Sequence, residues 1–182
     1  MYLDYTSLIL VDPIRDVTVS DSFFLGMGNI VLQSTAAGKG TIDGLSIQSN
    51  TFSNWNMPNN LTVVVDERSG THFTSILDFT MGSNAACPKM TAVGVTVRGS
   101  SGEASSPSTR FEVDFRGKMV FPNAPIASTH YLLEVEDDGF ARQALRPPSN
   151  MTVAVVTDVP VRAKATVTVS QSQYRPGNGG GI

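Results

Sequence analysis

Alternation of apolar and polar residues with a period of two is the feature that most restricts the fold of this chain. The segment 110–116 is the clearest case. Its residues Phe111, Val113 and Phe115 point to one side of an extended strand, and charged residues point to the other. Similar alternation recurs around 61–65, 93–97, 131–135, 153–155 and 163–169. No segment sustains the 3.6-residue period of an amphipathic helix, so the pattern predicts an all-β protein.

Turn signals divide these runs into short strands. Two longer polar loops, 53–60 and 99–108, add to the two-residue turn candidates Asp43-Gly44, Ser69-Gly70 and Asp138-Gly139. The spacing predicts an antiparallel β-sandwich of about 8–10 strands, with a jelly roll as the best single topology. We predict one domain over residues 1–174, followed by a glycine-rich tail over 175–182.

The segment 28–55 has a second interpretation. Residues 44–52 resemble one rung of the parallel β-helix of polysaccharide lyases and tailspike proteins, with Asn50 and Asn54 at turn-like places. The apolar residues that carry this resemblance are Ile30, Leu32, Ile42, Leu45, Ile47 and Phe52. A solenoid needs several stacked repeats, and the rest of the chain shows no repeat of that period. The sandwich is therefore the preferred prediction.

The chain is poor in charge. Charged residues make up 16% of it, against about 25% in an average protein. The net charge is −3, and no cluster of Lys or Arg offers the basic surface that nucleic-acid phosphates or anionic membranes require. A surface rich in Ser and Thr and poor in Lys is easily desolvated, and this favours repeated contacts between subunits.

The residue types that usually carry catalysis or bind metals are few and scattered. A single cysteine, Cys87, can form neither an internal disulfide nor a cysteine zinc site. His72 and His130 lie far apart, each next to an aromatic residue. The carboxylates of 136–138 lack the spacing of a calcium-binding loop and are interpreted as a solvated turn. We therefore predict no catalytic residue, no metal ligand and no cofactor.

The segment 37–41 has the superficial look of a phosphate-binding loop. Gln33 stands where that motif needs glycine, and Gly40 separates Lys39 from Thr41. The segment also precedes a predicted strand, so it lacks the helix N-terminus that would face a phosphate. It is interpreted as a flexible hairpin loop.

Two segments are candidates for contacts with other molecules. Trp55, Asn56 and Met57 form a polar loop around the only tryptophan, which could stack on a sugar or anchor an interface. The glycine-rich end of the chain could reach across to a neighbouring subunit of a symmetric assembly. The residues of this candidate assembly arm are Tyr174, Arg175, Pro176 and Ile182.

At the level of strand pattern the chain resembles small jelly-roll virion proteins, with 111–115 and 163–169 as typical late strands. The resemblance implies a non-enzymatic structural subunit of a virion: a capsid, decoration or spike protein. Its partners would be copies of itself and other particle proteins, without direct nucleic-acid or membrane binding. The chain lacks the basic N-terminal arm of coat proteins that condense RNA, which would place it in an outer or accessory position.

Two other functional classes remain open. One is a carbohydrate- or receptor-binding module, such as a tail-fibre tip or a lectin-like domain, with Trp55 and the loop 99–108 as its contact surface. The other is a glycan hydrolase, which would follow from the solenoid interpretation and would require two carboxylates about 5–10 Å apart across a groove. The N-terminus lacks the features of a signal peptide. We therefore expect synthesis in a cytoplasm, and location in the virion if the assembly interpretation holds.

Overall fold

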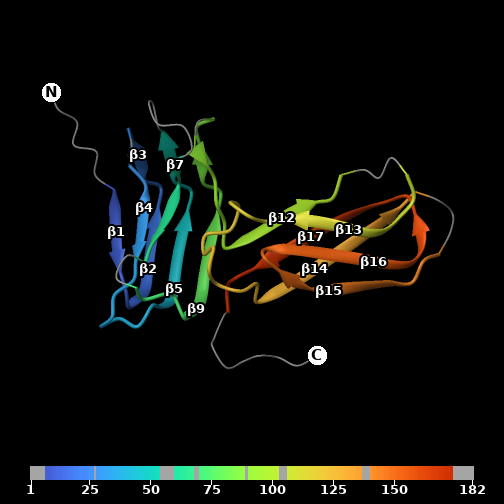
Figure 1. Ribbon diagram of the computed structural model, residues 1–182. Helices are drawn as coiled ribbons and strands as arrows, with labels where there is room; N and C mark the ends of the chain where they lie inside the picture. The colour runs from blue at the N-terminus through green and yellow to red at the C-terminus, as the bar shows by residue number, and fades with distance from the viewer. Residues whose placement is uncertain are drawn as a thin grey trace.

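The computed structural model describes residues 7–26, 28–53, 60–67, 70–88, 90–102, 106–136 and 140–173. These residues form seventeen strands and contain no helix, which confirms the all-β prediction. None of the described segments forms a helix long and apolar enough to cross a membrane. Figure 1 shows two β structures side by side, the first built from β1 to β11 and the second from β12 to β17.

The first part is a parallel β-helix. The chain passes through three sheets in turn and then returns to the first, so that each new strand pairs in parallel with the strand one coil earlier. The first sheet contains β1 (Leu8–Val11), β4 (Ile30–Gln33) and β8 (Val63–Asp66). The second contains β2 (Ile14–Ser20), β5 (Thr41–Gln48) and β9 (Ser75–Gly82). The third contains β3 (Phe23–Leu25), β6 (Thr51–Ser53) and β10 (Ala85–Ala86). A short parallel pair, β7 (Asn60–Leu61) and β11 (Met90–Thr91), accompanies them.

Stacked apolar side chains fill the interior of the β-helix. Parallel pairing in register places the same inward position of each coil above the next, so Ile14, Ile42 and Ile76 form one buried column. Phe24 and Phe52 stack in the same way, with ring centroids 4.8 Å apart. This continuous core spans the coils and explains why a single coil would not be stable alone.

Asparagines hold the sharp turn between the second and third sheets. The residue before each turn asparagine, Ser49 or Ser83, has a left-handed backbone. The buried side chain of Asn50 donates to the carbonyl of Val19 and accepts from the amide of Ser22, at 2.9 and 3.1 Å. Asn84 repeats this role one coil later and receives the backbone N–H of Asn50. The turn is therefore cross-linked from coil to coil.

The second part is an antiparallel β-sandwich. One sheet has the order β12 (Thr96–Ser100), β17 (Ala163–Ser170), β14 (Ser128–Val135), and the other has β13 (Ser108–Asp114), β16 (Thr152–Val161), β15 (Gln143–Ser149). Phe111, Val113 and Phe115 are buried between the sheets, as their alternation predicts. On β17 every second residue is fully buried, from Ala163 to Val169.

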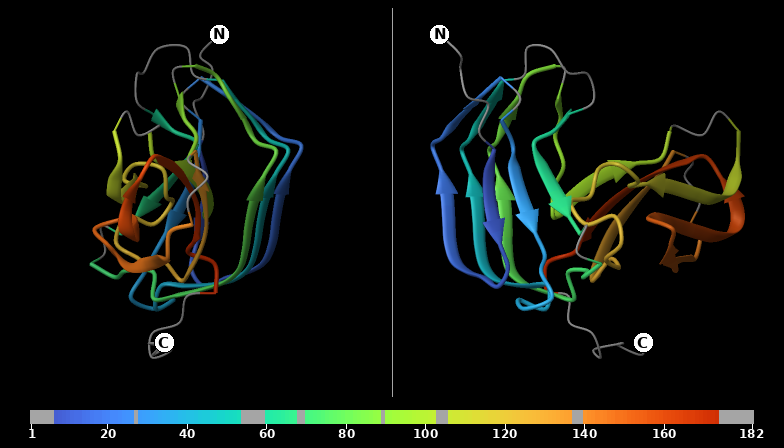
Figure 2. Two further views of the ribbon diagram at one scale, coloured as in Figure 1. Left: turned by 90° about the vertical axis from the view of Figure 1, so that its right-hand side faces the viewer. Right: turned by 60° about the vertical axis from the view of Figure 1, so that its left-hand side comes forward.

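The segment that joins β13 to β14 covers the last coil of the β-helix. Phe121 lies edge-on against Phe73 and Phe79 of the β-helix, with centroid distances of 5.4 and 5.9 Å. Gln171, fully buried just after β17, binds the backbone of Phe121 and the carbonyl of Ala124. An apolar contact and neighbouring hydrogen bonds therefore join the two parts, which lie next to each other in the right-hand view of Figure 2.

The prediction of an antiparallel sandwich was wrong for the first half of the chain, and the structure does not confirm a jelly roll. Alternation shows which side chains are buried, but a β-helix and a sandwich share that pattern. The coils are also unequal, because Ile42 follows Ile14 by 28 residues and Ile76 follows Ile42 by 34. Because the coils differ in length, the sequence shows no repeat with a fixed period. The β-helix interpretation of 28–55 was correct over its described part, where Ile30, Leu32, Ile42, Leu45, Ile47 and Phe52 all point inward.

Candidate functional site on the outer face of the second sheet

The outer face of the sheet β2–β5–β9 carries the polar groups of the β-helix in ordered columns. Thr18, Ser46 and Thr80 are register partners in adjacent coils, so their side chains form a row of hydroxyl groups along the helix axis. Neighbouring strands lie about 4.8 Å apart, which sets the spacing of the row. Parallel register thus converts residues distant in sequence into one repeating polar surface.

A left-handed residue interrupts every strand of this sheet at the same level. The residues are Asp16, Gly44 and Asp78, with φ of 49°, 79° and 46°. The pairing between neighbouring strands omits each of these residues, which lies between one residue that points outward and one that points inward. Each strand therefore has two successive outward positions at this level. In the left-hand view of Figure 2 the three strands bend together at one level. The bend is therefore a property of the sheet and not of one strand.

Three carboxylates gather at the bend. Asp16 and Asp78 occupy the left-handed position of the first and third coils, and Asp43 precedes Gly44 in the middle coil. All three residues are exposed. Two strand spacings separate Asp16 from Asp78, or about 9–10 Å between their backbones. Because Gly44 has no side chain, the Asp16 carboxylate reaches over it: a Cβ on Gly44 would lie 2.9 Å from Asp16 Oδ1.

The two outer carboxylates have different surroundings. Asp78 Oδ1 accepts a hydrogen bond of 2.7 Å from the side-chain amide of Gln173, which follows the sandwich strand β17 and itself has a left-handed φ of 70°. Among the described residues, the carboxylates of Asp16 and Asp43 show no hydrogen bond or ion pair. Gln173 thus attaches the sandwich to one end of the carboxylate cluster.

This arrangement provides the elements of acid–base chemistry on an extended ligand. Two carboxylates separated by roughly 6.5–9.5 Å leave room for a sugar linkage and a water molecule between them. Positioned carboxyl groups act as general acid and general base when they reach the reacting atoms. The hydroxyl row of Thr18, Ser46 and Thr80 lies beside them on the same face and can hydrogen-bond to successive sugars.

A second group of titratable side chains, centred on Glu67, already makes its hydrogen bonds to other groups of the protein. Glu67 accepts hydrogen bonds from Phe73 N–H at 3.0 Å and from Asn123 at 3.0 Å, and pairs with His72 at 2.7 Å. Burial raises the pKa of Glu67, but these hydrogen bonds outweigh it and the net pKa lies below the usual 4.5. Because Asn123 belongs to the segment that covers the last coil, this group holds the two parts together.

The glycine-containing loop 35–40 binds a side chain of the protein itself. The buried carboxylate of Asp12 accepts hydrogen bonds from the backbone and hydroxyl of Thr35, both at 2.7 Å, and from Gly40 N–H at 2.5 Å. A Cβ on Gly38 would collide with Asp12. Backbone donors of this loop are therefore engaged within the protein, which agrees with the prediction that the segment is not a phosphate-binding loop.

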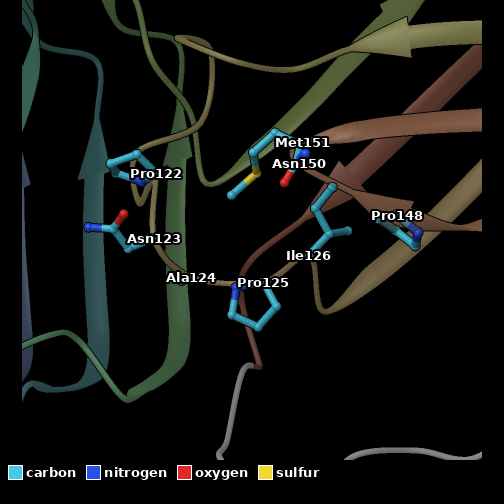
Figure 3. A pocket seen from close by; sticks show the side chains of 8 residues that line it. All are labelled: Pro122, Asn123, Ala124, Pro125, Ile126, Pro148, Asn150 and Met151. Carbon is cyan, nitrogen blue, oxygen red and sulfur yellow. The ribbon is translucent and has the colours of Figure 1, made fainter.

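A cavity of about 310 Å³ lies between the segment 122–126 and the turn that joins β15 to β16, as Figure 3 shows. Its lining combines apolar side chains with the amides of Asn123 and Asn150, and it contains no titratable side chain among the described residues. The lining residues are Pro122, Asn123, Ala124, Pro125, Ile126, Pro148, Asn150 and Met151. A smaller, largely apolar cavity of about 240 Å³ shares Pro122 and Met151 with it. Neither cavity offers an acid–base pair, so the outer face remains the better candidate site.

The contact segments predicted from sequence lie outside the described residues. These are the loop residues Trp55, Asn56 and Met57 and the arm residues Tyr174, Arg175, Pro176 and Ile182. Cys87 is half-buried. His72 pairs with Glu67, while His130 lies on β14 of the sandwich. The described residues contain no group of three or more His, Cys, Asp or Glu that could hold a metal ion.

Sequence inspection missed the three carboxylates because 62 residues separate Asp16 from Asp78. A local signal did exist. Each bend follows an inward isoleucine by two positions, in the segments 14–17, 42–45 and 76–79. Aligning these segments on that isoleucine would have revealed the column, but only after the coil lengths were known.

Comparison with known proteins adds an independent observation. No family model matches the chain, and no solved structure matches it. The chain is similar to polygalacturonase QRT3 of Arabidopsis thaliana. The two are 33% identical over 171 residues, which is 93% of this chain. The chain spans only about a third of the length of that relative.

The similarity corrects the functional prediction. A non-enzymatic capsid, decoration or spike subunit of a virion is contradicted, because the relative is named as a polygalacturonase. The virion prediction depended on a sandwich over the whole chain, and half of the described chain is a β-helix instead. This relative instead supports a glycan hydrolase, which is the function that would follow from the solenoid interpretation.

Proposed function

We propose that this chain acts as a glycoside hydrolase that cleaves an acidic polysaccharide of the polygalacturonate class and carries its site on the β-helix. The similarity to polygalacturonase QRT3 supports the reaction class. The observation that carries the proposal is the cluster of Asp16, Asp43 and Asp78, which three coils of the β-helix bring to one bend of the outer face.

The polysaccharide would lie along the helix axis across β2, β5 and β9. Hydroxyl groups of Thr18, Ser46 and Thr80 would hydrogen-bond to its sugars and fix its position. One carboxyl group would donate a proton to the leaving glycosidic oxygen, while the opposite carboxylate removes a proton from the attacking water. Asp16 and Asp78, which flank the middle coil, are the two groups that we assign to these roles.

The test is release of reducing ends from polygalacturonic acid by the purified chain, together with binding to the same polymer. We expect Asp16→Asn and Asp78→Asn to lower kcat by about 10²-fold or more, as removal of a general acid or base does. Glu134→Gln, a change of the same kind on an exposed position of β14, is the matched control and should leave kcat unchanged.

Three results would count against the proposal. Absence of reducing-end release by the unaltered chain would refute hydrolysis. Full activity of both aspartate variants would refute the site. Equal loss in the Glu134→Gln control would show that the effect is not specific to the outer face.

A further inference from the structure

A side chain from the end of the sandwich reaches the carboxylate cluster of the β-helix. The side-chain amide of Gln173, just after β17, donates a hydrogen bond of 2.7 Å to Asp78 Oδ1. In Figure 1 the red end of β17 lies beside β9, the strand that carries Asp78. Among the described residues, Asp78 is the one member of the cluster whose carboxylate has a hydrogen-bond partner, and Gln173 provides it.

The backbone that presents Gln173 is held in place by its neighbour Gln171. This neighbour is fully buried, and both ends of its side-chain amide hydrogen-bond to the backbone of Phe121. Its own backbone N–H donates to the carbonyl of Val95 at 2.9 Å. Support of this kind holds a side chain in one geometry. The hydrogen bond to Asp78 is therefore made from a fixed point, although both of its partners are exposed.

Both partners of this hydrogen bond have a left-handed backbone, with φ of 70° at Gln173 and 46° at Asp78. A left-handed conformation is unfavourable for residues that carry a Cβ, and glutamine lacks the tolerance for it that asparagine and aspartate have. Such conformations persist where the surrounding structure imposes them, and they cluster at functional sites. Two of them joined side chain to side chain therefore suggest a function for this contact.

We propose that Gln173 is a positioning residue for Asp78, an inference that rests on the proposed hydrolase function. Its amide holds Oδ1 and thereby fixes the rotation of the carboxylate. The second oxygen, Oδ2, is then left to exchange a proton with the substrate or with the attacking water. Gln173 acts through Asp78 alone. The sandwich thus completes a site whose carboxylates all lie on the β-helix.

The expected effect of Gln173→Ala is a lower kcat with little change in KM. Without the amide, the Asp78 carboxylate rotates freely, and imprecise placement of a reacting group slows the chemical step. The hydroxyl row that would bind the polysaccharide is unaltered. We expect kcat on polygalacturonic acid to fall about tenfold and KM to change by less than about twofold.

A double-mutant cycle tests whether Gln173 acts through Asp78. The experiment measures kcat and KM for the unaltered full chain, Gln173→Ala, Asp78→Asn and the double variant. The double variant should be no slower than Asp78→Asn alone, because no carboxylate is left to position. Gln143→Ala, the same change at an exposed position of β15, is the matched control and should leave kcat unchanged.

The outcomes separate this inference from the proposed function. Absence of hydrolysis by the unaltered chain would refute the hydrolase and this inference with it. With an active chain, an unchanged kcat of Gln173→Ala would overturn the positioning role alone. A further tenfold fall from Asp78→Asn to the double variant would overturn it as well.

Urea unfolding distinguishes a positioning residue from a structural tether. Gln173→Ala and Gln143→Ala should unfold at the same urea concentration. A Gln173→Ala variant markedly less stable than this control, or one that raises KM and leaves kcat unchanged, would identify a tether between the two parts and overturn the inference.

Discussion

The left-handed backbone of the bend is a residue-scale feature, and Gly44 is its most sensitive position. Its φ of 79° disfavours any side chain, and an added Cβ would lie 2.9 Å from Asp16 Oδ1. We expect Gly44→Ala to lower the free energy of unfolding by about 1–2 kcal/mol, because a left-handed conformation penalises alanine. It should also displace Asp16 and reduce hydrolysis. Urea unfolding measures the first effect.

Gly82 provides the matched control for this substitution. It ends β9 of the same sheet, and a Cβ there would meet no atom within 4 Å. Gly82→Ala should leave the stability unchanged within about 0.5 kcal/mol. Equal stability of the Gly44→Ala and Gly82→Ala variants would contradict the strain assigned to the bend.

At the scale of elements, the asparagines between the second and third sheets determine how the coils stack. Asn50 is 1% exposed and satisfies the carbonyl of Val19 and the amide of Ser22. Asn50→Ala would leave both groups without a partner in the core. We expect a loss of about 2–4 kcal/mol, since each unsatisfied buried group costs about 1–3 kcal/mol. Chemical denaturation of the variant checks this value.

The exposed neighbour Gln48 tests whether the effect belongs to the turn or to any change at the end of β5. Gln48 bonds only weakly, to Thr80 at 3.5 Å. Gln48→Ala should change the stability by no more than about 0.5 kcal/mol. If both variants lost the same stability, the coil-to-coil hydrogen bonds would not be the cause.

Some strands of both halves of the chain could be predicted from the local sequence. Alternation predicted the buried faces of β13 and β17 correctly. The apolar residues of β4, β5 and β6 matched a β-helix rung, but the sandwich was preferred over that interpretation. The pairing direction could not be predicted, because alternation with a period of two occurs in strands of both parallel and antiparallel sheets and does not specify the direction of the neighbouring strand. Asn50 was recognised as a turn residue, but its hydrogen bond to Asn84 depends on the stacking of coils.

At the scale of the whole molecule, Glu67 couples the β-helix to the sandwich in a pH-dependent way. Its pKa in the folded protein lies below 4.5. The stabilisation is therefore complete above about pH 4.5 and is lost as the pH falls through the lower folded-state value. We expect Glu67→Gln to lower the stability at pH 7 and to have progressively less effect below pH 4.5. Urea unfolding at several pH values measures the difference.

Glu112 is the control for general effects of acid. It pairs with Arg110 on the surface of β13, where both side chains are more than half exposed and the solvent screens their attraction. Glu112→Gln should change the stability little at either pH. A difference for Glu67→Gln that stayed constant from pH 7 to pH 3 would contradict the assigned role of its ionised carboxylate.

The sequence by itself determined which residues are buried, because the hydrophobic effect acts on each side chain and alternation records it directly. It also indicated that the chain forms strands without helices. Only the tertiary structure decided that the first half winds into coils of 28 and 34 residues. That winding brings Asp16, Asp43 and Asp78 to one bend. Proximity of these residues depends on inter-strand register, which is set by packing across the whole core, and so the local signal at each bend could not reveal the candidate site before the coil lengths were known.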